Sequence, residues 1–264
     1  MRRVFFGLIP LLTSSVVGLV ATGCAQEKGG GSVKTTLVVY AASSLTEAFQ
    51  SVEEAFEKAN SEIEVKISFA GSQVLRVQIE QGAQVDVFAS ANQGHMNGLI
   101  ASGHIPDSKA FASNELVLVV PRANPAAIEV FGDLTKASLI VLGSDNAPVG
   151  IYTRQMLDRA GLVLGRDFLA SVLSHVVSLE HNVRLVRSKV EMGEADAAII
   201  YRTEASSARL KMVPIPKNLN AQVRYPIGVL ARSANASQAK RFVDYVLSEE
   251  GRRILYHHDF LGAE

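Results

Sequence analysis

The sequence predicts an α/β protein with two α/β units, and two features of its 264 residues carry this prediction. From residue 33 onward, short apolar runs rich in β-branched residues alternate with runs whose apolar residues recur at helical spacing. This alternation occurs before the strongly apolar run at 115–121 and again after it. With 48% hydrophobic and 20% charged residues, the composition is that of a globular protein with ample material for a core. We therefore expect a parallel sheet with helices on both faces.

The first unit opens with an apolar run that ends at two serines and is followed by a helical pattern. Leu45, Phe49, Val52 and Phe56 recur at the spacing that places them on one helix face. The unit is predicted to contain strands at 35–41, 64–70 and 85–90 and helices at 45–59, 72–82 and 92–103.

The second unit begins with the strand predicted at 115–121, which Pro121 ends. The remaining predicted elements are strands at 138–143, 196–201, 211–216 and 223–230, helices at 150–161 and 182–195, and a C-terminal helix pair at 237–255. We expect one α/β domain to consist of residues 33–114 and 222–264, and the other of residues 115–221.

Residues 1–24 have the pattern of a targeting segment. Arg2 and Arg3 precede a long apolar stretch, and small residues lead to Cys24. This resembles a bacterial lipoprotein signal that is cleaved before Cys24, whose thiol then carries lipid. An ordinary secretory signal and an uncleaved membrane anchor are the alternatives. Residues 25–32 read as a flexible Gly-rich tether, and the single cysteine excludes an intramolecular disulfide.

Two predicted strand-to-helix turns of the first unit place serines where ligands bind in open α/β sheets, off the carboxyl ends of the strands. Ser44 precedes a helix and has Glu47 three residues later, a spacing that predicts a capping box. Ser72 follows Gly71, whose lack of a side chain permits a close backbone approach or a positive φ. Either serine could serve its own helix as a cap or donate to a ligand.

The second unit offers three more donors at equivalent places. Pro148 precedes a helix start, so the N–H of Val149 has no partner within the helix. Val183 opens the next predicted helix in the same way, and Tyr201 ends a predicted strand. A Pro-initiated helix without a ligand and a tyrosine half-buried in the core are the alternatives.

Taken together, these turns predict an anion site without charged side chains. Helix N-termini aimed at one point bind anions, and none of the proposed donors is Asp or Glu. An O–H of a protonated oxyanion such as phosphate would find no acceptor, so the donors favour a fully ionised tetrahedral dianion. Donor chemistry alone does not separate sulfate from a larger oxyanion.

Other functional classes lack their motifs. The chain has no G-x-S-x-G, P-loop or G-x-G-x-x-G motif, so we expect no enzyme activity. The six histidines show no metal-ligand spacing, and His257, His258 and Asp259 are expected to form a surface cluster. Because Lys plus Arg and Asp plus Glu number 26 each, no basic excess indicates a nucleic-acid partner.

Several segments resemble the molybdate-binding proteins of bacterial ABC transporters, over about residues 36–256 and in that family's order. They are YAASSLTEAF, SFAGSQVLRVQIEQGAQVDVFASANQGHMNGL, NELVLVVP, APVGIY, NVRLV, AIIYRTEA and VRYPIGVL. The chain departs from the family at Gly71, where a serine is common, and at Asn182, where an acidic residue often stands.

The resemblance implies a periplasmic binding protein type II fold, in which two α/β domains enclose a ligand cleft. It implies that molybdate or tungstate, with no cofactor, is held through its oxygens. Ser44 and Ser72 would donate through hydroxyl and backbone N–H groups, Val149 and Val183 through backbone N–H groups, and Tyr201 through its hydroxyl. It also implies a setting at the outer face of a cell membrane or in the periplasm, with a transporter permease as partner. The lipid predicted on Cys24 would be the membrane contact, and we expect a monomer.

Overall fold

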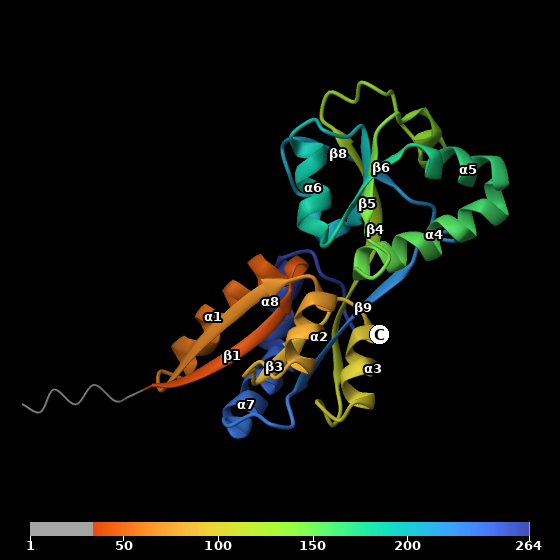
Figure 1. Cartoon of the computed structure of the whole chain (residues 1–264). Coiled ribbons are helices and arrows are strands. Elements are labelled where there is room, and N and C mark those ends of the chain that lie inside the picture. The colour runs from red at the N-terminus through yellow and green to blue at the C-terminus, as the bar shows by residue number, and fades with distance from the viewer. Residues whose placement is uncertain (1–33, 264) are drawn as a thin grey trace, which may run out of the picture. The chain divides into compact units, whose positions relative to one another are not determined.

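The computed structural model describes residues 34–263, and residues Val33–Glu264 cluster as one compact unit. The predicted signal segment, Cys24 and the tether at 25–32 lie outside the described residues. The strands are β1 (Thr35–Ala42), β2 (Ile63–Ala70), β3 (Val87–Ala89), β4 (Lys109–Pro121), β5 (Ile140–Gly143), β6 (Val176–Glu180), β7 (Ala197–Tyr201), β8 (Leu210–Pro214) and β9 (Gln222–Val229). The α-helices are α1 (Thr46–Ala59), α2 (Ser72–Glu80), α3 (Gln93–Ala101), α4 (Pro148–Leu164), α5 (Arg166–Ser174), α6 (Val183–Glu191), α7 (Ala236–Leu247) and α8 (Glu249–His257). Short 3-10 helices are η1 (Ser43–Leu45), η2 (Phe131–Lys136) and η3 (Arg202–Glu204) (Figure 1).

In the described part of the chain, nine strands form one mixed sheet in the order β2-β1-β3-β9-β4-β7-β5-β6, with β8 paired to β4. β1 is parallel to β2 and β3, and β5 is parallel to β6 and β7. The long strand β4 joins the two halves, because residues 109–115 pair with β9 and residues 116–121 pair with β7 and β8. We call the β2-β1-β3-β9 half with its helices the first lobe, and the β7-β5-β6-β8 half with its helices the second lobe.

Helices cover both faces of each half of the sheet. In the first lobe, Leu75 of α2 and Met96 of α3 belong to one buried cluster, whereas Phe49 of α1 and Phe242 of α7 belong to another. In the second lobe, α6 lies on one side of the strands and α4 and α5 lie on the other (Figure 1). Each helix therefore buries one apolar stripe against the sheet, which is the source of most helix stability in proteins.

The structure confirms the predicted α/β fold and the parallel pairing of the first three strands. The sheet as a whole is mixed, because β4 and β9 run antiparallel to their neighbours and to each other. Helix α4 begins at Pro148 rather than at residue 150, since proline fits the first helical position, where no N–H is needed.

Some elements have no counterpart in the sequence prediction. Strand β4 begins at Lys109, six residues before the predicted strand, and α5 and β6 were not predicted at all. Strand β6 contains five residues and alternates half-buried with exposed positions, so it lacks the apolar run that marked the buried strands. The domain boundaries near 114/115 and 221/222 stay predictions.

Across residues 34–263, no helix has both the length and the apolar character that crossing a membrane requires.

Candidate functional site

A small pocket lies at the carboxyl ends of the strands, and residues of both lobes line it. Its lining consists of Ala42, Ser43, Ser44, Ala70, Gly71, Ser72, Ala91, Pro148, Val149, Asn182, Val183 and Tyr201. The cavity volume is about 10 Å³, counted as room for the centre of a water-sized sphere. Such a volume leaves no room for a sugar or a peptide. None of the described residues that line the pocket carries a charge.

The structure brings all five predicted ligand residues together in this pocket. Ser44 and Ser72 enter from the first lobe, and Val149, Val183 and Tyr201 enter from the second. Each is at most 5% exposed. Their assignment as ligand contacts stays a prediction, whereas their convergence is a feature of the fold.

Four helices begin at the pocket, and each turns its N-terminus toward it. Ser44 is the second residue of η1, which continues directly into α1, and Ser72 is the first residue of α2. Val149 is the second residue of α4 and Val183 is the first of α6. The N–H groups of a first helical turn have no acceptor within their own helix and carry the positive end of the helix dipole. The pocket is therefore electropositive without containing a cationic side chain.

The cap of α6 leaves one particular N–H free for the pocket. The side-chain oxygen of Asn182 accepts hydrogen bonds from the N–H groups of Arg184 at 3.0 Å and Leu185 at 3.1 Å. The N–H of Val183, between the cap and these two residues, is not engaged by the cap. Asn182 thus orients the helix start and leaves the Val183 donor available.

The Ser72 hydroxyl is held so that its hydrogen is free to point elsewhere. Its oxygen accepts a hydrogen bond from the N–H of Ala91 at 3.0 Å, and the residue is fully buried. Because a hydroxyl has one hydrogen to donate, and this contact uses only a lone pair, Ser72 retains its donor capacity.

Tyr201 places a phenol in the pocket with no hydrogen-bond partner among the described residues. The side chain is 1% exposed, and burial raises the pKa of the phenol well above its usual value, with nearby Tyr225, Tyr152 and Glu204 adding to the shift. The phenol is therefore a neutral donor at physiological pH. An unpaired buried hydroxyl is rare, because it costs about 1–3 kcal/mol, so Tyr201 remains a candidate for a ligand contact.

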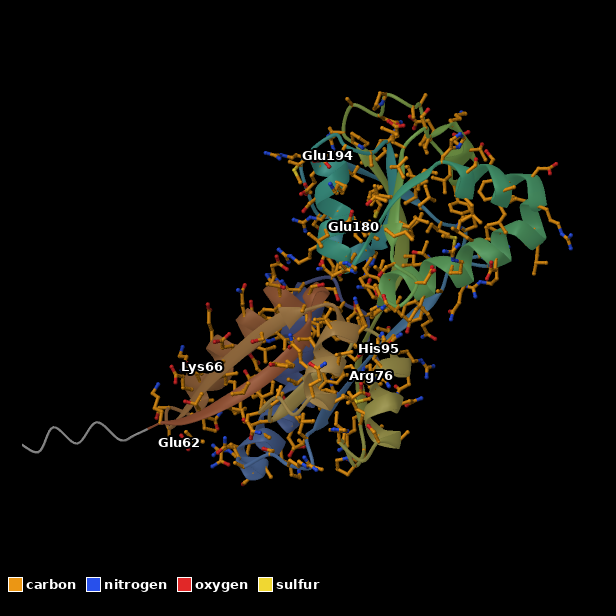
Figure 2. All side chains as sticks on the ribbon, viewed as in Figure 1. Glu62, Lys66, Arg76, His95, Glu180 and Glu194 are labelled. Atoms are coloured by element: carbon orange, nitrogen blue, oxygen red, sulfur yellow. The ribbon has the colours of Figure 1, made fainter. Side chains whose placement is uncertain are left out.

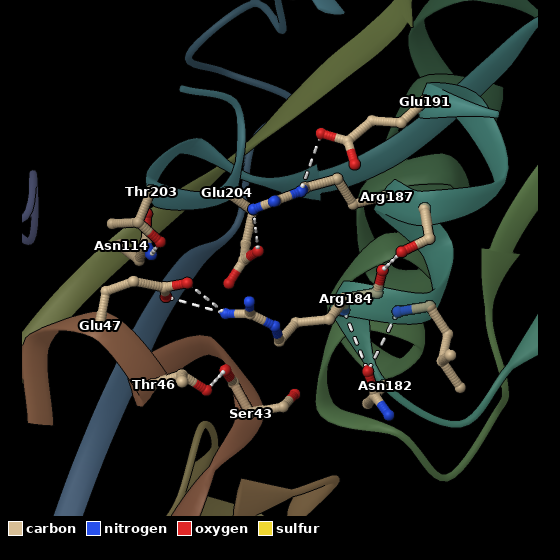
Figure 3. Close-up of polar contacts among 12 residues, drawn as sticks. Ser43, Thr46, Glu47, Asn114, Asn182, Arg184, Arg187, Glu191, Thr203 and Glu204 are labelled. Carbon is tan, nitrogen blue, oxygen red and sulfur yellow. Dashed lines mark hydrogen bonds and ion pairs between the residues drawn. The ribbon is translucent and has the colours of Figure 1, made fainter. Parts of the chain in front are cut away.

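The predicted capping box at Ser44 and Glu47 is wrong. Helix α1 has Leu45 at its N-cap position with no side-chain cap, because η1 precedes it without a break. The hydroxyl of Ser44 lies 3.1 Å from that of Tyr225. The Glu47 carboxylate accepts hydrogen bonds from Arg184 at 2.7 and 2.8 Å (Figure 3). Gly71 has φ −61°, so of its two predicted roles only the close approach applies: a Cβ there would lie 2.5 Å from the carbonyl oxygen of His181.

Three polar contacts connect the lobes beside the pocket. The first is the ion pair of Glu47 on α1 with Arg184 on α6 (Figure 3). In the second, the Gln73 side chain donates to the carbonyl oxygen of His181 at 2.6 Å. In the third, Nε2 of His95, labelled in Figure 2, donates to the carbonyl oxygen of Asn146 at 2.8 Å. These contacts hold α1, α2 and α3 of the first lobe against α6 and the loops before α4 and α6.

The start of α4 depends on Gly150, and we expect Gly150→Ala to lower the free energy of unfolding by about 1–3 kcal/mol. A Cβ at this position would overlap the carbonyl oxygen of Ser144 and lie 2.5 Å from that of Gly143. Neither backbone group can move without displacing the end of β5. Urea unfolding followed by circular dichroism measures the change.

Gly132→Ala is the matched control, because a Cβ there meets no heavy atom within 4 Å. We expect this variant to be as stable as the wild type or slightly more stable. Equal losses for both variants would contradict the packing role of Gly150.

Two residues next to the pocket were not among those that the sequence predicted. Tyr225 on β9 contacts Ser44, and the side chain of Asn114 on β4 contacts Tyr225 at 3.5 Å. Tyr225 is 181 positions from Ser44 along the chain, so no local pattern connects them. Only the placement of β9 and β4 in the centre of the sheet shows the contact.

The C-terminal histidines, His257 and His258, do not line the pocket. Nε2 of His258 contacts the Ser51 hydroxyl at 2.9 Å, and His257 is exposed. Within residues 34–263, no group of three His, Cys, Asp or Glu residues could hold a metal ion.

Comparisons with known proteins identify relatives of the whole described chain. The chain is 35% identical over 253 residues to the molybdate-binding protein ModA of Mycobacterium tuberculosis strain H37Rv, covering 93% of each. Among solved structures, the substrate-binding domain of a putative molybdenum ABC transporter from Clostridium difficile matches with a TM-score of 0.67 and 28% identity, covering 88% of this chain and all of that one. The periplasmic molybdate-binding protein of Azotobacter vinelandii matches with a TM-score of 0.75 and 20% identity, covering 86% and 100%.

The similarity extends through both lobes, since the family model for bacterial extracellular solute-binding proteins matches residues 37–261. These residues include every strand after the start of β1 and all four helices that begin at the pocket. The chain therefore belongs to the family of bacterial extracellular solute-binding proteins, whose fold has two α/β domains.

Proposed function

We propose that this protein is the substrate-binding component of a molybdate ABC transporter, a role of capture and delivery rather than catalysis. One observation carries the proposal. Four helix N-termini and the unpaired Tyr201 phenol converge on a small pocket whose lining carries no charge. The relatives named as molybdate-binding proteins support molybdate as the anion, and tungstate has the same tetrahedral shape and charge.

The donors suit a dianion that carries no proton. Ser44, Ser72 and Tyr201 offer hydroxyls, and Val149 and Val183 offer backbone N–H groups. Hydrogen bonds to a charged group contribute roughly 1.5–3 kcal/mol each. Five such bonds offset the cost of removing water from a small dianion and leave useful affinity. The protein has a formal net charge of zero, so it offers no overall positive field that would attract an anion. The fixed N–H dipoles of the pocket attract the anion locally instead.

The ligand would close the two lobes on each other. Because two donors come from the first lobe and three from the second, the bound ion satisfies all five only when the lobes meet. A ligand that contacts both halves favours the closed state by the difference in its affinity for the two states. The ion pair of Glu47 with Arg184 connects the lobes at the same edge and would add to this preference.

Titration calorimetry tests the proposal, and we expect molybdate and tungstate to bind far more tightly than sulfate or phosphate. Phosphate carries an O–H for which the lining offers no carboxylate acceptor, and sulfate is smaller than molybdate, so it reaches fewer donors at once. Equal affinities for sulfate and molybdate would overturn the specificity. Tight binding of phosphate would contradict the donor-only character of the pocket.

The proposed setting is the outer face of a cell membrane or the periplasm. The extracellular family supports this setting. We infer that Cys24 carries a lipid anchor, that the protein acts as a monomer, and that the closed form docks on a membrane permease. Mass spectrometry of the mature N-terminus checks the lipid on Cys24.

A further inference from the structure

A series of hydrogen bonds, partly buried at Thr203 and buried beyond it, runs from the second lobe to the pocket and ends at Ser44. The Asn114 side-chain nitrogen lies 2.9 Å from the Thr203 hydroxyl and 3.5 Å from the Tyr225 hydroxyl. The Tyr225 hydroxyl lies 3.1 Å from that of Ser44. Asn114 is 1% exposed, Tyr225 is fully buried and Ser44 is 5% exposed, so water does not compete for these groups.

Asn114 determines which groups donate and which accept in this series of hydrogen bonds. The side-chain oxygen of Asn114 accepts a hydrogen bond from the N–H of Glu115 at 2.9 Å, which assigns the other side-chain atom as the NH₂ group. That group can only donate, so the oxygens of Thr203 and Tyr225 accept from it.

The phenol hydrogen of Tyr225 then has one acceptor within reach. Among the described residues, Ser44 Oγ is the acceptor within hydrogen-bond distance of the Tyr225 hydroxyl. A phenol hydrogen left unpaired in a buried site is costly. Tyr225 therefore donates to Ser44, which leaves the hydrogen of Ser44 free to point into the pocket.

We propose that Asn114 and Tyr225 are specificity-determining positioning residues, which hold the Ser44 hydroxyl as a hydrogen-bond donor and so make the pocket reject oxyanions that carry a proton. This inference rests on the proposed oxyanion function. The Ser72 hydroxyl is also held as a donor, in this case because its oxygen accepts a hydrogen bond from the Ala91 N–H. Ser44 and Ser72 are thus both held as donors, so their hydrogens face a ligand O–H.

Sulfate and hydrogenphosphate test this polarity separately from size and charge. At pH 8 both are small tetrahedral dianions, and they differ by one O–H. The measured quantity is the ratio of the hydrogenphosphate Kd to the sulfate Kd, each obtained by competition against molybdate so that weak binding is measurable. We expect the wild type to favour sulfate clearly.

Tyr225→Phe removes the donor to Ser44 and frees a lone pair that can accept from hydrogenphosphate. We expect the ratio to fall about fivefold to tenfold, the effect of about one net hydrogen bond. Asn114→Asp exchanges the donor and acceptor roles in this series of hydrogen bonds, because the phenol then donates to the new carboxylate and accepts from Ser44. We expect the ratio to fall further, and the added negative charge cancels because both ions carry the same charge.

One control separates polarity from packing. Tyr245→Phe changes a tyrosine that packs on Phe56 away from the pocket, and it should leave the ratio unchanged.

The outcomes distinguish this inference from the proposed function. A wild type that binds no molybdate overturns both. A wild type that binds molybdate overturns the inference alone if it does not discriminate between the two small ions, or if folded Tyr225→Phe and Asn114→Asp both keep the wild-type ratio.

Discussion

Tyr201→Phe is expected to weaken molybdate binding by about 10- to 100-fold while leaving the ligand-free protein at least as stable as the wild type. The loss follows from removing one hydrogen bond to a charged ligand, worth roughly 1.5–3 kcal/mol. The stability follows from the phenol's environment: it is buried without a partner among the described residues, so its removal takes away an unsatisfied group. Calorimetry with molybdate and urea unfolding without ligand measure the two effects.

The opposite signs of these two effects make the test specific. A tyrosine whose hydroxyl merely filled the core would lose stability on substitution and leave binding unchanged. Tyr245→Phe serves as the control, since this tyrosine packs on Phe56 outside the pocket. Unchanged molybdate affinity in Tyr201→Phe would contradict the contact.

Adding Ser44→Ala to Tyr201→Phe should weaken molybdate binding again, because the ion then loses a donor from each lobe. If the double variant still binds molybdate as the wild type does, the assigned pocket is wrong.

Glu204→Gln is expected to change how stability depends on pH. Glu204 is 2% exposed, and its carboxylate accepts a hydrogen bond from Arg187 at 3.0 Å (Figure 3). Burial raises the pKa of this carboxyl from 4.5 to about 7, Arg187 and Arg184 lower it, and Glu47 raises it. The folded protein therefore keeps this proton at pH values where the unfolded chain has lost it.

The sign of the effect follows from proton binding. Below about pH 4.5 both states hold the proton, and between about pH 4.5 and 7 the folded state holds more of it. The free energy of unfolding thus falls as the pH rises through this window, by on the order of 3 kcal/mol for a shift of this size. Glutamine stays neutral throughout, so Glu204→Gln should gain stability relative to the wild type between pH 5 and pH 8.

Urea unfolding of both proteins at pH 5 and pH 8 measures this difference. Glu54→Gln, at an exposed position on α1, reports the effect of removing one negative charge from the surface. Parallel pH profiles for the wild type and Glu204→Gln would show that Glu204 holds no proton at neutral pH in the folded protein.

The sequence by itself determined the elements that build the pocket. Apolar runs followed by Ser44 and Ser72 place helix starts at strand ends, because strand and helix periodicities and turn residues are local properties of the chain. The helical pattern from residue 182 placed a helix start at Val183, although the strand before it, β6, was not predicted. The same local patterns placed a helix start two residues after Pro148, where α4 begins, and identified Tyr201 as the end of a strand. The carboxyl ends of parallel strands share an edge, so the grouping of these donors within each lobe followed from local signals. The meeting of the two groups depends on β4 and β9, which join the lobes.

Only the tertiary structure decided which partners these groups have. Ser44 contacts Tyr225 instead of capping its own helix, and Glu47 pairs with Arg184 in the other lobe. These contacts span 181 and 137 positions of the chain, and side-chain pairs at such separations depend on the order and register of the sheet. The sequence thus predicted where the donors lie. The pairing of β9 with β4 beside them decided which way the Ser44 hydroxyl points, because a hydroxyl donates or accepts according to the neighbours that folding brings to it.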